Sequence, residues 1–240
     1  MQLVIQHNLP TELVLPINYQ YVIQGMIYNS LRILPGYAEF LHNYGYDYGD
    51  RQFRMFTFSR LKGKYNIEGN KIIFKEHISF EVRSPEVLLL KVLKATLEQN
   101  GIQYQDMKYY NVSASLKDDT IECDELKIRM MTPIVAYETD IVTKKTHYFD
   151  PYSQEFYDRV QKNLRRKYFA FTGSEVLRDV ELLPVKVQDR DKCVTKYKGF
   201  YITGWCGEYV LKGERKYLDF LYQTGIGSKN AQGFGMFEIE

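Results

Sequence analysis

The order of the expected strands and helices constrains the fold of this chain most strongly, because a similar order occurs in both halves. The spacing of apolar residues in the first half predicts, in sequence order, a strand over 4–7, a helix over 18–34, strands over 54–58 and 71–83, a helix over 84–97 and a strand over 102–115. Pro35 follows the end of the first helix, and Asn100-Gly101 ends the second. The first half is therefore expected to have the order β-α-β-β-α-β.

The second half is expected to repeat this order with some elaboration. Its expected elements are a strand pair over 128–137 and 143–149, a helix over 153–168, strands over 180–188 and 199–211, a helix over 214–223 and a last strand over 233–240. Two such units predict an α+β protein of tandem ferredoxin-like folds, each an antiparallel sheet with two helices on one face. Polar, turn-prone residues near 114–120 suggest the boundary, so we expect an N-terminal domain over 1–117 and a C-terminal domain over 118–240.

The composition argues against several classes of protein. The longest uninterrupted apolar runs have four residues, whereas a membrane-spanning helix needs about 20. The N-terminal residues show neither a basic leader nor a long apolar core, so we expect no secretory signal, no membrane association and a cytoplasmic protein. The three cysteines, Cys123, Cys193 and Cys206, have a spacing that matches no zinc pattern. We therefore expect neither a metal site nor a cofactor.

A glycine-rich segment near the C-terminus is the strongest single candidate for a binding loop. Four glycines occur within eleven residues, at Gly225, Gly227, Gly233 and Gly235. Successive backbone N–H groups in such a loop can form a concave anion site. Three side chains between the glycines add donors for phosphate oxygens: Lys229, Asn230 and Gln232. The simpler alternative is a tight connection from a helix to a strand that needs positive φ angles.

An alternative from another functional class is a metabolic enzyme that binds a dinucleotide with this loop. The corresponding glycine fingerprint follows a strand and opens a helix. Here the glycines follow the helix expected over 214–223 and lead into the last strand, so the order of elements disfavours that interpretation.

Basic residues recur along one expected helix. The formal net charge is only +2, so a site for a polyanion must be a local patch. Five basic residues recur there at steps of three and four residues, which places four of them on one side of the helix over 153–168: Arg159, Lys162, Arg165, Arg166 and Lys167. This stripe is typical of a surface that follows a phosphate backbone. A solvated helix face is the alternative.

Several motifs resemble those of a known family of RNA-processing proteins. The two Gly-hydrophobic-Gly motifs at 225–227 and 233–235 resemble the glycine-rich motif of the RAMP (repeat-associated mysterious protein) superfamily. The segment 15–29 (LPINYQYVIQGMIYN), with Leu41-His42, 54–59 (RMFTFS) and 131–136 (MTPIVA), is similar to the CRISPR-associated protein six family. The resemblance covers nearly the whole chain in element order and is sharpest over 13–59 and 225–237. It implies an endoribonuclease that cuts precursor CRISPR RNA within its repeats.

The resemblance also implies an active site in the first half. The family's catalytic positions correspond to Tyr28 on the first helix, His42 in the following loop and Arg54 on the next strand. The family often has lysine at the third position. Because arginine binds phosphate well but is a poor proton donor, charge stabilisation is the expected role of Arg54. Taken singly, the three residues could equally be a loop histidine, a core tyrosine and a solvated arginine.

The chemistry that this site implies needs no metal ion. The ribose 2′-hydroxyl attacks the adjacent phosphate and leaves a 2′,3′-cyclic phosphate and a 5′-hydroxyl. Histidine is suited to the proton transfer, and cations offset the charge of the transition state. The expected partner is CRISPR repeat RNA, with subunits of a CRISPR effector complex as further partners and a monomeric or homodimeric state. A non-catalytic RAMP subunit that holds processed guide RNA is the alternative.

Overall fold

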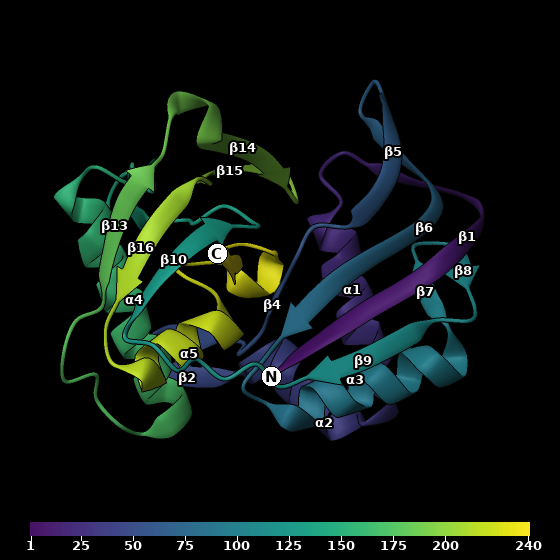
Figure 1. Cartoon of the computed structure of the whole chain (residues 1–240), viewed down its shortest axis with the longest axis horizontal. Helices are drawn as coiled ribbons and strands as arrows, with labels where there is room; N and C mark the ends of the chain where they lie inside the picture. Colours follow the sequence, from purple (N-terminus) through teal and green to yellow (C-terminus); the bar gives the residue numbers. More distant parts are fainter.

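The computed structural model describes residues 1–240, and its first half is built on one antiparallel sheet (Figure 1). The strands of this sheet are β1 (Gln2–Pro16), β4 (Thr57–Phe58), β5 (Lys62–Glu68), β6 (Lys71–Arg83) and β9 (Ser113–Lys117). They lie in the order β4-β6-β1-β9, and β5 also pairs with β6. The two main helices of this half are α1 (Gln20–Ser30) and α3 (Val87–Asn100).

The second half contains a sheet of the same strand order. Its strands are β10 (Glu125–Met130), β13 (Glu181–Lys186), β16 (Glu208–Lys212) and β17 (Phe237–Ile239), in the order β13-β16-β10-β17. Its helices are α4 (Gln154–Thr172) and α5 (Arg215–Thr224). In the first sheet β1 lies between β6 and β9, and β4 lies beside β6. In the second sheet β10 likewise lies between β16 and β17, and β13 lies beside β16. This antiparallel arrangement confirms the predicted tandem ferredoxin-like fold.

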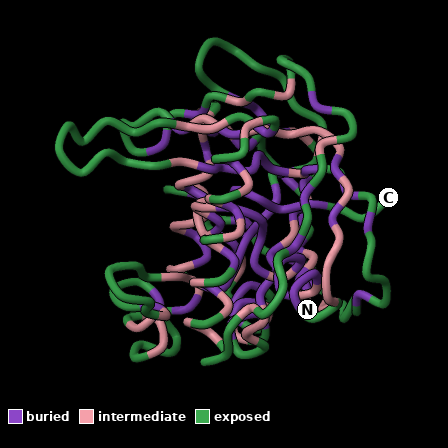
Figure 2. The backbone as a smooth tube through the Cα atoms, turned by 90° about the vertical axis from the view of Figure 1, so that its left-hand side faces the viewer, coloured by how far each residue is buried: buried purple, intermediate pink, exposed green.

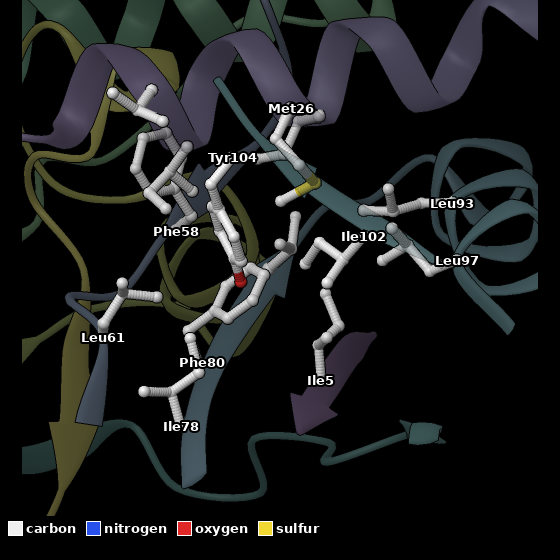
Figure 3. Close-up of a cluster of buried hydrophobic side chains, with 14 of the residues drawn as sticks. Ile5, Met26, Phe58, Leu61, Ile78, Phe80, Leu93, Leu97, Ile102 and Tyr104 are labelled. Carbon is white, nitrogen blue, oxygen red and sulfur yellow. The ribbon is translucent and has the colours of Figure 1, made fainter. Parts of the chain in front are cut away.

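The two sheets are supported by largely separate hydrophobic cores. In β1, alternate residues from Leu3 to Leu9 are buried, as expected for a strand with one covered face. They pack with Leu90, Leu93 and Leu97 of α3 in a core that Figure 3 shows in part. A second core gathers residues of α4, α5 and the second sheet. Figure 2 shows the buried segments inside and the exposed ones in peripheral loops. We propose residues 1–117 and 118–240 as the two domains.

The first strand and the first helix differ in length from the prediction. The strand expected over 4–7 continues to Pro16. Its register with β6 shifts between Leu9 and Leu13, and this irregularity accommodates Pro10 within the strand. The helix expected over 18–34 is shorter, and a 3₁₀ turn, η1 (Leu31–Ile33), follows it.

The segment between the first helix and the strand expected over 54–58, where the sequence indicated only a loop carrying His42, contains regular structure. It contains a short helix α2 (Pro35–Glu39), one π-helical turn η2 (Phe40–Tyr44) and a hairpin of β2 (Tyr46–Tyr48) and β3 (Arg51–Phe53). The extended stretch expected over 102–115 is also divided, into a hairpin of β7 (Ile102–Tyr104) and β8 (Met107–Tyr109) followed by β9.

The second half contains two hairpins outside its main sheet. The pair predicted over 128–137 and 143–149 is replaced by β10, in the main sheet, and a separate hairpin of β11 (Tyr137–Thr139) and β12 (Thr146–Tyr148). The strand predicted over 199–211 is interrupted at Gly207, whose φ of 108° favours glycine. This break separates β16 from a second hairpin, β14 (Lys192–Tyr197) and β15 (Phe200–Trp205).

The glycine-rich segment and a buried arginine hold the two halves together. Figure 1 shows the segment between the halves, where its 3₁₀ turn η4 (Asn230–Gln232) lies beside β4. The Thr57 hydroxyl on β4 donates to the Phe234 carbonyl at 3.2 Å. Arg83 on β6 is buried and donates to the Phe237 carbonyl, with the Tyr222 ring 3.9 Å from its guanidinium carbon. No helix of the chain is long and apolar enough to cross a membrane.

Candidate active site and basic cleft

A cleft of about 600 Å³ opens between the two halves, and both halves supply its walls. Its first wall belongs to α1 and the segment from η2 to the residue after β3, with the side chains of Gln24, Tyr28, His42, Arg51, Gln52 and Arg54. Helix α4 supplies Arg159, Lys162, Asn163, Arg166 and Lys167. The glycine-rich segment supplies Ser228, Lys229, Asn230, Ala231 and Gln232. The structure therefore brings the three predicted catalytic residues together with the predicted basic helix and the middle of the predicted loop.

The rings of Tyr28 and His42 are neighbours in this cleft. Their centroids are 5.4 Å apart and the rings are nearly perpendicular. Tyr28 lies at the edge of the first core, where its ring also meets Phe56, so the core holds it in place. Burial raises the pKa of the Tyr28 hydroxyl, and the positive charge of Arg54 opposes this shift. The hydroxyl therefore stays protonated at neutral pH and can donate a hydrogen bond to a ligand.

Arg54 fixes the backbone of the segment that carries His42. Its Nε donates to the Leu41 carbonyl at 2.9 Å, and one terminal nitrogen donates to the His42 carbonyl at 2.7 Å. These carbonyls belong to η2, the last helical turn before β2, where backbone oxygens lack partners within the helix. Gly45 lets the end of η2 lie close to the segment that carries Arg54, because a Cβ on Gly45 would lie 2.5 Å from the Phe53 carbonyl oxygen. Arg54 thus positions His42 in addition to placing a charge in the cleft.

A hydrogen bond to the neighbouring amide orients the imidazole of His42. Nδ1 of His42 lies 2.8 Å from Oδ1 of Asn43, and both side chains are exposed at this point. Since the amide oxygen only accepts, this contact assigns the proton to Nδ1. The Nε2 atom of the neutral ring is then the one that can accept a proton.

The glycines of the C-terminal segment are buried and face protein. None of the four glycines lines the cleft. A Cβ on Gly233 would lie 2.6 Å from the Phe58 ring, and one on Gly235 would lie 2.0 Å from the Ile226 carbonyl oxygen. All four have φ between 71° and 85°, which favours glycine. The glycines therefore lie close to other parts of the protein, whereas Lys229, Asn230 and Gln232 line the cleft. RNA binding by this segment stays a prediction.

The basic helix faces the cleft with part of its predicted stripe. Lys162 is exposed, Arg166 lies over the Tyr48 ring, and Arg159 pairs with Glu138 of β11 at 2.6 Å. Arg165, although next in sequence, pairs with Asp179 at 2.6 Å and does not line this cleft. The helix has this orientation because Phe156, Val160 and Leu164 form its buried face.

Two polar residues of the cleft, Gln24 and Asn163, were not predicted, and Lys167 does not lie on the exposed face expected for the basic stripe. Gln24 donates to the Ala231 carbonyl at 2.7 Å and so ties α1 to the glycine-rich segment. Asn163 has a buried oxygen without a hydrogen-bond partner, and Lys167 is buried against the loop. Helical spacing could have indicated the two missed residues. Gln24 is four residues before Tyr28, and Asn163 is four residues after Arg159.

The charges of the cleft are strongly unbalanced compared with those of the chain. Seven lysine or arginine residues line it, against two carboxylates, Asp50 and Glu138, whereas the whole chain has 32 basic and 30 acidic residues. Such a concentration of cations between low-dielectric walls attracts a polyanion. No group of three or more histidine, cysteine, aspartate or glutamate side chains is arranged to hold a metal ion. The cleft can therefore hold a phosphate backbone with one histidine and one tyrosine beside it.

Comparison with known proteins points to one family. The family model described as CRISPR associated protein Cas6, C-terminal, matches residues 116–239. The CRISPR-associated endoribonuclease Cas6 1 of Methanocaldococcus jannaschii is 29% identical over 237 residues, which cover 93% of this chain and 86% of that protein. The CRISPR-associated endoribonuclease Cas6 of Pyrococcus furiosus is 24% identical over 234 residues, 94% and 83% of the two chains.

The fold is shared with solved structures of the same group. A structure titled "An RAMP protein binding different RNA substrates" matches with a TM-score of 0.79 and 21% identity, over 100% of this chain and 98% of that chain. At this identity the likeness concerns the fold.

Proposed function

Because the chain belongs to the Cas6 family of CRISPR-associated proteins, we propose that it is an endoribonuclease that binds CRISPR repeat RNA and cuts precursor CRISPR RNA within the repeat. The observation that carries this proposal is the position of Tyr28 and His42 on one wall of a cleft lined by seven basic residues. The related proteins of Methanocaldococcus jannaschii and Pyrococcus furiosus are named endoribonucleases, which supports the same activity here.

The proposed reaction uses the RNA's own 2′-hydroxyl as nucleophile. Nε2 of His42 accepts the proton of that hydroxyl, whose oxygen forms a bond to the adjacent phosphorus. The bond from phosphorus to the 5′-oxygen breaks, and this oxygen takes a proton from water in the open cleft. The products are a 2′,3′-cyclic phosphate and a 5′-hydroxyl.

The other two residues stabilise the charge that develops on the phosphate. The Tyr28 hydroxyl donates a hydrogen bond to a non-bridging oxygen, since its raised pKa keeps it protonated. The Arg54 guanidinium keeps donors beyond those bound to Leu41 and His42, and its charge faces the same oxygens. No step of this mechanism uses a metal ion.

A non-catalytic RNA-binding subunit is the second candidate function, and one observation favours it. Arg54 stands where lysine is frequent in the family, and its guanidinium already binds two backbone carbonyls. An arginine so engaged has fewer donors for a phosphate in the transition state.

A cleavage assay distinguishes the two candidates. A CRISPR repeat RNA, incubated with the protein in EDTA, should be cut at one position in each repeat. A shuffled RNA of the same length should stay intact. Tight binding of the repeat without any cutting would assign the chain to the non-catalytic class.

Replacing Lys162 and Arg166 together with alanine should lower the affinity for RNA and make that affinity less dependent on the salt concentration. If each contacts one phosphate, the slope of log affinity against log salt concentration should fall by about 0.7 for each lost contact with single-stranded RNA. The measurement is a salt titration of repeat binding by the Lys162→Ala/Arg166→Ala variant. Arg165→Ala is the matched control, since Arg165 lies on the same helix but pairs with Asp179 outside the cleft. An unchanged slope in the double variant would contradict a phosphate-binding role for this face.

A further inference from the structure

Lys167 differs from the other basic residues of the cleft because its side chain is buried. Its exposed fraction is 1%, and its Nζ donates to the Gly225 carbonyl at 2.7 Å and to Oδ1 of Asn230 at 3.0 Å. Burial lowers the pKa of the Lys167 ammonium to about 7, and no charged neighbour opposes that shift. Both of its partners are uncharged oxygens of the glycine-rich segment.

Asn230 connects the two ends of that segment. Its Nδ2 donates to the Ile226 carbonyl at 3.2 Å and to the Phe234 carbonyl at 3.1 Å. Ile226 and Phe234 are the middle residues of the two Gly-hydrophobic-Gly motifs, so one amide ties both motifs together. A Cβ on Gly225 or Gly235 would lie 2.7 Å from the same nitrogen, which explains why both motifs need glycine at these places.

The residues between the two motifs are the ones that line the cleft. Residues 228–232 face the wall that carries Tyr28 and His42, and Gln24 binds the Ala231 carbonyl from that wall. Lys229 has a φ of 64°, a conformation that costs energy for a residue other than glycine. A segment in this state keeps a single position only if its surroundings fix it. Lys167, through Asn230, connects it to the long helix α4.

We propose that Lys167 is a positioning residue for RNA binding, which acts through Asn230 to hold residues 228–232 in the conformation that receives the RNA backbone. Lys167 itself does not contact the phosphates, because its ammonium is buried and already donates to Gly225 and Asn230. The inference rests on the proposed function for the identity of the ligand, but the effect on the segment itself does not depend on RNA.

The first test is a double-mutant cycle on RNA affinity. The probe is the CRISPR repeat RNA of the cleavage assay with 2′-deoxyribose at the cleavage site, and the active fraction of each protein is titrated. Lys167→Met and Asn230→Ala should each raise the dissociation constant by about 10-fold to 100-fold, and the double variant should match the weaker-binding single variant within about twofold. The salt slope should stay that of the wild type. Lys94→Met is the control and should bind normally, because Lys94 is a half-buried lysine of α3 that pairs with Glu98 and does not line the cleft.

Three results of this test would overturn the proposal. Unchanged affinity in Lys167→Met would show that the segment needs no support from α4. If the losses of binding free energy in the two single variants added up in the double variant, Lys167 would not act through Asn230. A salt slope reduced by about 0.7 would show a direct phosphate contact. If Lys167→Met does not fold, Asn230→Ala alone decides, because wild-type affinity in that variant would also overturn the proposal.

Hydrogen exchange of the free protein separates this proposal from the proposed function. In Lys167→Met the amides of residues 226–235 should exchange at least about tenfold faster, while those of β1 and β6 keep their protection. Cleavage activity does not enter this measurement, so it remains informative even if repeat RNA proves to be the wrong ligand. Unchanged exchange in residues 226–235 would overturn the positioning role.

Discussion

Replacing His42 with alanine is expected to lower the rate of repeat cleavage by about 10² to 10⁴-fold, the usual contribution of a general acid or base. Histidine is a side chain suited to proton transfer, and this one is exposed in the cleft beside Tyr28. It stands on an exposed turn whose backbone Arg54 holds in place, so its removal leaves the surrounding structure intact. The measurement is the single-turnover rate at saturating enzyme.

The affinity for the repeat should change little in the same variant. Seven basic residues of the cleft remain, and they supply most of the electrostatic attraction. His77→Ala is a suitable control, since this exposed histidine lies on β6 and does not line the cleft. If His42→Ala lost binding and cleavage to the same extent, His42 would belong to recognition and not to the chemistry.

The tandem fold could be predicted because its main elements have clear periodic patterns. The alternation in β1 and the apolar stripe of α3 each indicate one buried face, and both elements occur where expected. The added hairpins were missed because short paired strands need little burial. The break at Gly207 was missed because the apolar pattern continues across it, and only the positive φ of the glycine separates β15 from β16.

The cleft was partly predictable, since Tyr28, His42 and Arg54 follow a family pattern and the stripe on α4 follows helical spacing. Their convergence depends on how the two halves pack, which no local pattern reports. The same holds for Lys167. In sequence it continues the basic stripe, whereas in the structure the rotation of α4 buries it beside the glycine-rich segment. The role of Gly233 was likewise hidden, because the bulky neighbour that it accommodates is Phe58 of the other half.

Removing a single 2′-hydroxyl from the RNA should abolish cleavage, because the proposed nucleophile is then absent. The substrate has deoxyribose on the 5′ side of the scissile phosphate and is otherwise unmodified. Binding should survive, since one lost hydroxyl costs a contact of about 0.5–1.5 kcal/mol at most. The modified repeat should therefore remain a tight, uncleaved ligand in the basic cleft.

The most direct test of the mechanism compares this substrate with unmodified repeat RNA, each in EDTA and in magnesium. The account predicts that the unmodified RNA is cut at the same rate in both conditions, with a 2′,3′-cyclic phosphate on the product, and that the deoxy substrate is cut in neither. Cutting of the deoxy substrate, or inhibition by EDTA that magnesium reverses, would contradict the roles proposed for Tyr28, His42 and Arg54.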